Sequence, residues 1–139
     1  MTDHELMQIA EDARAHSYAP YSHFCVGAAL LGAGGRVYTG CNIENAAYSP
    51  TNCAERTAFF KAVSEGERHF VAIAVIGGKD GEKGGFCAPC GVCRQVMAEF
   101  CAPDFRVILG TVEEHKSYTL SSLLPASFGA DDLTGGDKA

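Results

Sequence analysis

The chain has 139 residues and a formal net charge of −6, and nearly half of its residues are apolar. This composition is typical of one compact domain spanning residues 1–139, and without a dense run of Lys and Arg a nucleic-acid partner is not expected. No stretch is long and apolar enough to cross a membrane, and the acidic N-terminus has no signal-peptide pattern, so we expect a cytoplasmic protein. The seven cysteines are then expected to be metal ligands or buried thiols instead of disulfides.

The first half of the chain predicts a helix, a hairpin and a second helix. Apolar residues at helical spacing predict a helix from about Asp3 to His16, with Thr2 and Glu5 as a capping pair. The glycine-rich segment 32–35 separates two strand-like stretches and predicts a hairpin turn. The expected elements are strands at 24–31 and 36–43, a loop at 45–52, and a helix from near Cys53 to near Gly66.

The second half alternates strands and helices. The Val- and Ile-rich run at 70–76 predicts a central strand buried on both faces. We expect a glycine-rich surface loop at 77–88, a helix at 90–101, a strand at 105–109, a short strand around Tyr118, a short helix at 120–124, and a polar, mobile tail from about Asp131. This order predicts the α/β class, as a three-layer α-β-α arrangement with a mixed sheet of about five strands.

Two short cysteine motifs point to a metal site. Cys53 opens one predicted helix, and Cys90 and Cys93 lie three residues apart at the start of another. Helix N-termini lower thiol pKa values, and three thiolates can hold Zn²⁺ with a fourth position open for water, as in catalytic zinc sites. Glu55, two residues after Cys53, is suited to carry protons beside such a metal.

The net charge of three thiolates on one zinc ion requires compensation. Arg56 and Arg94 each follow a proposed ligand directly, so either guanidinium could hydrogen-bond to a thiolate and draw charge from it. We favour Arg56 for this role, with Arg94 as a second candidate.

Less specific interpretations remain open at this point. Asn52 and Glu55 also fit a capping box, in which Glu55 would only cap a helix. Cys87 forms a second C-x-x-C with Cys90, so four cysteines could close a structural zinc site or hold an iron–sulfur cluster. The remaining cysteines lie in apolar surroundings and are expected to be packing residues: Cys25, Cys41 and Cys101.

Several ordered blocks resemble the cytidine deaminases, specifically the small homotetrameric kind with an all-cysteine zinc site. The blocks are Tyr18–Ser22, Phe24–Leu30, Gly40–Tyr48, Cys53–Thr57, Pro89–Val96 and Leu123–Pro125. The resemblance implies a hydrolase of pyrimidine salvage that converts cytidine and 2′-deoxycytidine to uridine and 2′-deoxyuridine with release of ammonia. It also implies one Zn²⁺ per chain and a homotetramer whose active sites are shared between subunits.

The resemblance further assigns roles to individual residues. It implies zinc ligation by Cys53, Cys90 and Cys93, and proton transfer to the base by Glu55. Around the nucleoside it implies base packing by Phe24, ribose binding by Asn42 and Glu44, contact of the pyrimidine with the backbone N–H of Ala54, and contributions from neighbouring subunits by Tyr48 and Phe128.

Rival functions predict different features. A deaminase of an aminoglycosyl-nucleoside antibiotic would have less use for Asn42 and Glu44, and a nucleotide deaminase would need basic residues for the phosphate. A structural zinc or iron–sulfur protein would use Cys87 as a fourth ligand and would not depend on Glu55.

Overall fold

The structure is a computed structural model and describes residues 1–135. Its strands are β1 (Phe24–Gly32), β2 (Val37–Cys41), β3 (Phe70–Lys79), β4 (Arg106–Gly110) and β5 (His115–Thr119); its helices are α1 (Asp3–Ala13), the 3₁₀ turn η1 (Arg14–His16), α2 (Ala54–Ser64), α3 (Gly91–Phe100), α4 (Leu120–Leu123) and α5 (Ala130–Thr134). The strands form one sheet in the order β2-β1-β3-β4-β5. Only β3 and β4 pair in parallel; the other pairs are antiparallel.

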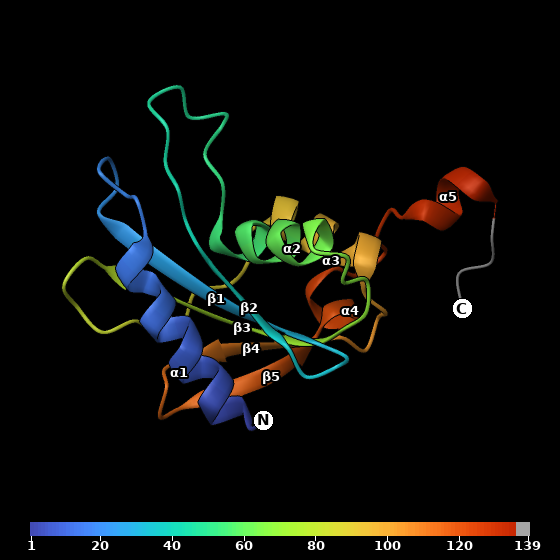
Figure 1. The fold of residues 1–139 in the computed structure, drawn as a ribbon. Helices are drawn as coiled ribbons and strands as arrows, with labels where there is room; N and C mark the ends of the chain where they lie inside the picture. Colours follow the sequence, from blue (N-terminus) through green and yellow to red (C-terminus); the bar gives the residue numbers. More distant parts are fainter. Residues whose placement is uncertain (136–139) are drawn as a thin grey trace.

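The helices lie on both faces of this sheet. Figure 1 shows α1 on one face and α2 and α3 on the other, so the predicted three-layer α/β fold with five strands is confirmed. The expected helix at 3–16 corresponds to α1 followed by η1, and the Glu5 N–H donates to Thr2 Oγ1 as the capping pair predicts. Within residues 1–135, no helix is both long and apolar enough to span a membrane.

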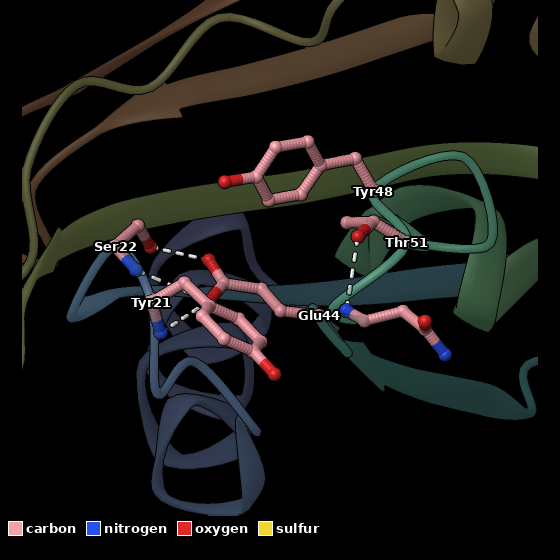
Figure 2. Close-up of a pocket in the computed structure, with 6 residues that line it drawn as sticks. Tyr21, Ser22, Glu44, Tyr48 and Thr51 are labelled. Atoms are coloured by element: carbon pink, nitrogen blue, oxygen red, sulfur yellow. Dashed lines mark hydrogen bonds between the residues drawn. The ribbon is translucent and has the colours of Figure 1, made fainter.

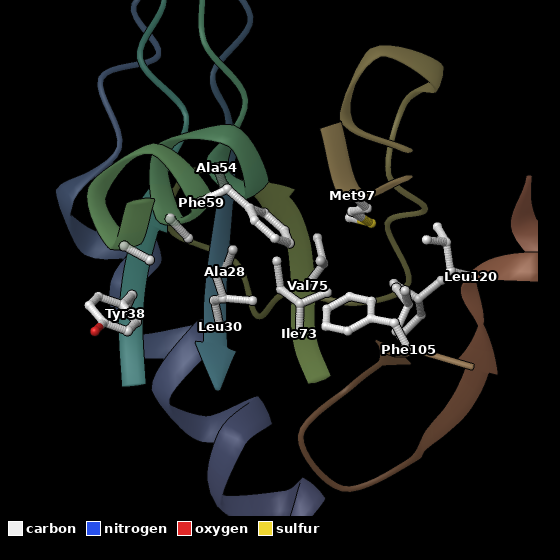
Figure 3. Packing of buried hydrophobic residues seen from close by; sticks show 14 residues of the cluster. Ala28, Leu30, Tyr38, Ala54, Phe59, Ile73, Val75, Met97, Phe105 and Leu120 are labelled. Atoms are coloured by element: carbon white, nitrogen blue, oxygen red, sulfur yellow. The ribbon is translucent and has the colours of Figure 1, made fainter. Parts of the chain in front are cut away.

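Two apolar clusters hold the layers together. The larger one packs α2 and α3 on the sheet (Figure 3) and centres on Phe59, whose ring meets the rings of Phe70, Phe100 and Phe105. The smaller one packs Leu6, Met7 and Ala10 of α1 on the opposite face. Alternate residues of β3 enter different clusters, because successive side chains of a strand point to opposite faces. This explains why the predicted central strand is apolar throughout.

Two glycines let helices approach the sheet closely. A Cβ at Gly40 would lie 2.2 Å from the carbonyl oxygen of Ala54 and 2.6 Å from the backbone nitrogen of Ala58. A Cβ at Gly27 would lie 1.9 Å from the carbonyl oxygen of Ala10. Real side chains do not fit at these distances, so Gly40 allows the first turn of α2 to lie directly on β2.

One sequence expectation is wrong in part. The surface loop expected at 77–88 begins later, because β3 continues to Lys79 and pairs with β1 through Gly77 and Gly78. The expected tail from Asp131 contains most of the short helix α5, whose first turn is closed by a bond from the Gly129 N–H to Asp132 Oδ2. Residues 136–139 of that expected tail lie outside the described residues.

Candidate metal centre

Two helix N-termini bring the cysteines of the two motifs together. Cys53 is the N-cap of α2 and Cys90 is the N-cap of α3, and neither side chain makes a capping hydrogen bond. The first N–H groups of a helix have no partner within it and carry the positive end of its dipole, so both positions favour a thiolate. Asn52 is therefore not the cap of α2; its side chain donates instead to Thr57 Oγ1. The alternative in which Glu55 pairs with Asn52 as a capping box is not the arrangement present.

The three proposed ligands have the spacing of a tetrahedral metal site. The sulfur of Cys90 lies 3.8 Å from that of Cys53 and 3.5 Å from that of Cys93. Zn–S bonds of about 2.3 Å in tetrahedral geometry place sulfurs roughly 3.8 Å apart. All three sulfur atoms lie within 4.8 Å of one another, and among residues 1–135 no other group of three such ligands is found. These residues therefore fit a metal ion that prefers soft ligands in a tetrahedral set.

Arg56 compensates the charge of this cluster directly. Its Nη2 donates to the Cys53 sulfur over 3.2 Å. Hydrogen bonds from the Cys93 thiol and from Arg56 lower the pKa of Cys53 to about 5 in the metal-free chain, while the pKa of Cys93 is raised because its proton serves that bond. Arg56 also interacts with the Cys93 thiol, while its Nε is buried without a hydrogen-bond partner.

Arg94 differs from its predicted role. Its Nε donates to the carbonyl of Pro89 over 2.8 Å and its Nη1 to the carbonyl of Leu123 over 2.5 Å. Its recorded bonds thus go to backbone oxygens and not to a thiolate. Arg94 ties the segment that enters α3 to α4, and so holds Cys90 in place mechanically.

Glu55 is a buried carboxyl group beside the cysteines. It lies in the first turn of α2, and only 4% of its surface is exposed. Burial raises the pKa of Glu55 to about 7, and the nearby charge of Cys53 acts in the same direction. A carboxyl group with this pKa exchanges protons readily near neutral pH, which is the property required of a general acid–base.

Cys87 lies next to the centre but outside the ligand set. It is not in the group of mutually close sulfurs. Burial raises the pKa of the Cys87 thiol to about 11, and the charge of Glu55 adds to this effect, so the group is neutral at pH 7. The three-ligand arrangement, and not the closed four-cysteine site, is the one that this geometry supports.

Asn42 and Glu44 follow β2 and connect loops near Phe24. The Asn42 side chain accepts from the Val26 N–H and donates to the Phe24 carbonyl. The Glu44 carboxylate accepts from the backbone N–H groups of Tyr21 and Ser22 and from the Ser22 hydroxyl. These bonds lower the pKa of Glu44, with the Ser22 hydroxyl as the main cause.

A cavity of about 420 Å³ opens beside Glu44 (Figure 2). Its lining consists of Tyr21, Ser22, Glu44, Asn45, Tyr48 and Thr51. These residues carry hydroxyl groups, an amide and one carboxylate, while most of the surface that they turn toward the cavity is apolar; no Lys or Arg is present there to bind a phosphate. None of the three cysteines lines this cavity, so it forms a separate part of the site.

The remaining predicted site residues are placed differently from one another. Ala54 is the first residue of α2, between Cys53 and Glu55, and it is fully buried. Phe24 begins β1 and is 38% exposed, whereas Tyr48 and Phe128 are 75% and 57% exposed. Phe128 lies in the segment before α5, which Figure 1 shows standing away from the sheet. The Phe128 carbonyl accepts a hydrogen bond over 2.7 Å from the side chain of Gln95, which lies in α3 with Cys93.

Sequence reasoning missed two glycines that shape the site. Gly40 lets α2 lie on β2, as described above. A Cβ at Gly77 would lie 2.9 Å from both the Cys87 sulfur and Cε2 of Phe24. Gly40 lies inside the strand predicted at 36–43, and Gly77 directly follows the strand predicted at 70–76. A glycine in a strand often marks a close approach of another segment, and this was the signal available in the sequence.

Comparisons with known proteins agree with this geometry. The family model for the cytidine and deoxycytidylate deaminase zinc-binding region matches residues 1–110. A cytidine deaminase of Sporosarcina psychrophila is 52% identical over 94% of this chain and 93% of its own length.

Solved structures show the same likeness. The crystal structure of a cytidine deaminase from Burkholderia pseudomallei has a TM-score of 0.84 and 48% identity, covering 92% of this chain and 100% of that one. That of the Mycobacterium tuberculosis cytidine deaminase has a TM-score of 0.79 and 37% identity, covering 93% and 99%. Since the family model spans most of the chain and the relatives match nearly all of it, the chain belongs to the cytidine and deoxycytidylate deaminase family.

Proposed function

We propose that the protein is a hydrolase that deaminates cytidine and 2′-deoxycytidine to uridine and 2′-deoxyuridine, with release of ammonia, in cytoplasmic pyrimidine salvage. The observation that carries this proposal is the three-sulfur cluster at two helix N-termini with the buried Glu55 carboxyl beside it. Family membership supports the same reaction.

The cluster and Glu55 divide the chemistry between them. Cys53, Cys90 and Cys93 would hold one Zn²⁺ per chain, which supplies the Lewis acidity that makes water nucleophilic near neutral pH. Glu55 takes a proton from the attacking water as oxygen bonds to C4 of the base, and it protonates N3. It then takes the remaining proton from the new C4 hydroxyl and delivers it to the amine, so that the C4–N bond breaks, ammonia leaves and C4 becomes the carbonyl of uridine. A pKa near 7 suits a group that must both accept and donate in one cycle.

The nucleoside would be bound by Phe24 at the start of β1 and by Asn42 and Glu44 after β2. The Phe24 ring packs on the base, and the backbone N–H of Ala54 at the start of α2 donates to the pyrimidine. Asn42 and Glu44 bind the ribose, and Glu44 is one of the residues that line the cavity. The absence of basic residues from that lining favours a nucleoside over a nucleotide.

The working form is proposed to be a homotetramer with shared active sites. Tyr48 and Phe128 are large aromatic residues that one chain leaves mostly exposed. Exposed aromatic side chains of this kind are enriched at protein interfaces. In the tetramer they would complete the active sites of neighbouring subunits.

The direct test follows the ultraviolet change from cytidine to uridine with purified protein, beside a sample stripped of metal and one to which Zn²⁺ is restored. We expect turnover that disappears with the metal and returns with it. Folded, zinc-loaded protein that leaves cytidine and 2′-deoxycytidine unchanged would refute the proposal.

The closed four-cysteine alternative is tested by Cys87→Ala. Because the Cys87 sulfur lies outside the cluster, we expect one zinc per chain and most of the activity to remain. Metal content measured by elemental analysis decides the point: loss of zinc from the variant would show that Cys87 is a ligand.

A further inference from the structure

A buried arginine outside the metal centre binds four acceptors from separate parts of the chain. Arg14, in η1, is only 7% exposed. Its Nε donates to the Cys25 carbonyl over 2.7 Å, and its Nη2 donates to the Lys79 carbonyl over 3.1 Å. Its Nη1 donates to Glu11 Oε1 over 2.7 Å and to the Glu82 carbonyl over 2.9 Å. A buried guanidinium with this many partners holds the segments that it joins in a fixed geometry.

The segments joined by Arg14 are the start of β1 and the end of β3 with its following turn. Phe24 pairs with Lys79 at the last rung of this ladder, and the Asp80 N–H donates to the His23 carbonyl beyond it. The turn is held a second time by Glu11, whose Oε1 also accepts from the Gly84 N–H over 3.3 Å. Arg14 and Glu11 thus form a clamp on residues 79–84, which we call the β3 turn.

The β3 turn leads directly to two side chains of the proposed active site. Gly85 pairs with Gly77 across the turn, and Cys87 follows two residues later. The Cys87 sulfur and the Phe24 ring both lie over Gly77, where a side chain would otherwise project. Cys87 is also close enough to Glu55 and Arg14 for the charge of each to shift its pKa. Phe24 itself precedes Cys25, whose carbonyl Arg14 binds. The clamp therefore fixes both chain segments that form this wall.

We propose that Arg14 is a positioning residue that holds Phe24 and Cys87 in the wall of the nucleoside site by clamping the β3 turn to the start of β1. The inference rests on the proposed function, because the wall matters to catalysis only if a pyrimidine packs against it. The hydrogen bonds of Arg14 go to Cys25, Lys79, Glu82 and Glu11, and not to the cysteine ligands or Glu55. Its loss should therefore weaken substrate binding more than it slows the chemical step, and it should leave the metal in place.

The first test replaces Arg14 by Lys. An ammonium group keeps the charge opposite Glu11 but has three N–H donors for the four acceptors, so the clamp loosens while a buried charge remains paired. We expect KM for cytidine to rise by about tenfold or more, with kcat changed much less and one zinc per chain retained. Arg106→Lys is the matched control, because Arg106 anchors the other end of α1 through Asp3, away from the β3 turn. An equal rise of KM in Arg106→Lys would overturn the inference, since it would trace the effect to a loosened α1.

A second pair of variants tests the clamp with Arg14 intact. A Cβ at Gly84 would lie 2.6 Å from Glu11 Oε2, 2.7 Å from Cγ1 of the buried Ile76 and 3.0 Å from Arg14 Nη1, whereas a Cβ at Gly85 meets nothing within 4 Å. Gly84→Ala should displace the β3 turn from Arg14 and Glu11, and it should therefore raise KM as Arg14→Lys does. Gly85→Ala, at the next residue along the chain, should leave KM unchanged.

A readout independent of catalysis separates this inference from the proposed function. Alkylation of Cys87 in the zinc-loaded proteins is followed by peptide mass spectrometry, with the partly buried Cys101, which lies outside the clamp, as internal reference. We expect Cys87 to react several-fold faster in Arg14→Lys and Gly84→Ala than in the wild type or Gly85→Ala. If the protein deaminated no cytidine, this comparison would still report on the clamp. Unchanged Cys87 reactivity in both variants would overturn the inference whatever the activity.

Discussion

Glu55 owes its chemical character to where the chain buries it. The carboxyl group lies under the first turn of α2 with 4% of its surface exposed, and desolvation raises its pKa to about 7. The same residue on a solvated helix would be fully ionised at neutral pH and a poor proton donor. The position of one side chain, two residues from the Cys53 N-cap, thus supplies a group that can both take and give a proton.

Glu55→Gln should abolish most of the activity while leaving the protein intact. The amide preserves the size of the side chain but cannot exchange protons, so we expect kcat to fall by about 10²–10⁴-fold or more. Zinc content and the thermal unfolding transition should be retained, because Glu55 is not in the sulfur cluster. Glu65→Gln makes the same change at the other end of α2, where the carboxylate pairs with Arg36 on the surface, and should leave kcat unchanged. Near-normal turnover in Glu55→Gln would refute the assigned role.

At the residue scale, the sequence predicted interactions between residues that are close in the chain, and it did not predict interactions between residues that are distant in the chain. Cys90 and Cys93 are three residues apart at the start of one helix, so spacing alone brings them together. Arg94 also follows a ligand directly, yet it bonds to the carbonyl of Leu123, 29 positions further along the chain. Arg14 was overlooked for the same reason: apart from the nearby Glu11, its partners are backbone carbonyls of β1 and the β3 turn, which only the folded chain brings together.

At the scale of elements, the placement of α2 on β2 decides where Cys53 and Glu55 lie. Gly40→Ala would force a methyl group against the Ala54 carbonyl and the Ala58 nitrogen. We expect this overpacking to destabilise the protein by about 1–3 kcal/mol and to lower kcat by displacing Glu55. Gly34→Ala in the β1–β2 turn meets nothing within 4 Å and serves as the control. Urea denaturation and steady-state kinetics on both variants check the prediction, which fails if they behave alike.

Glu44 links two loops, and its charge makes that link dependent on pH. The folded-state pKa of Glu44 is lowered, so its ionised form stabilises the folded chain above the ordinary pKa, and this contribution is lost as pH falls through the lowered value. We expect Glu44→Gln to be less stable than the wild type at pH 7 and the two to converge in acid, below about pH 4. Urea midpoints measured across this range test it, with Glu113→Gln in the β4–β5 turn as the control for loss of one charge. A difference that persists unchanged in acid would contradict the role of ionisation.

Most of the elements could be predicted because their periodicity reflects burial. The run at 70–76 is apolar on both faces since helices cover both, and the helix at 3–16 presents one apolar face to the sheet. The end of β3 was taken for a loop because Gly77 and Gly78 carry no side chains that show a pattern. In the fold, the Phe24 ring and the Cys87 sulfur fill the space above Gly77, which makes glycine suitable for a strand there. Packing of that kind leaves no local signature.

At the scale of the whole molecule, the chain carries apolar surface that its own core does not use. Tyr48 has a positive φ of 61°, an uncommon conformation for a bulky residue, and extends its ring from the loop between β2 and α2. No residue of α5 is buried, and Phe128 and Leu133 beside and within it are 57% and 80% exposed. These features are those expected of a subunit whose outer segments pack on its neighbours, which supports the proposed tetramer.

Sharing of active sites between subunits can be tested by mixing two defective variants. Glu55→Gln lacks the proton carrier, and Phe128→Ala would lack the aromatic ring supplied to a neighbour, so each homotetramer should have low activity. In randomly mixed tetramers, about a quarter of the sites would combine an intact Glu55 with an intact neighbouring Phe128, because the two defects then lie on different chains. We expect activity to recover toward that fraction once native mass spectrometry shows mixed assemblies. Glu55→Gln mixed with Cys53→Ala is the control, since both defects fall in the same part of the site and no recovery should occur. Mixed tetramers without recovered activity would place Phe128 outside the active site, and a protein that stays monomeric while active would exclude sharing altogether.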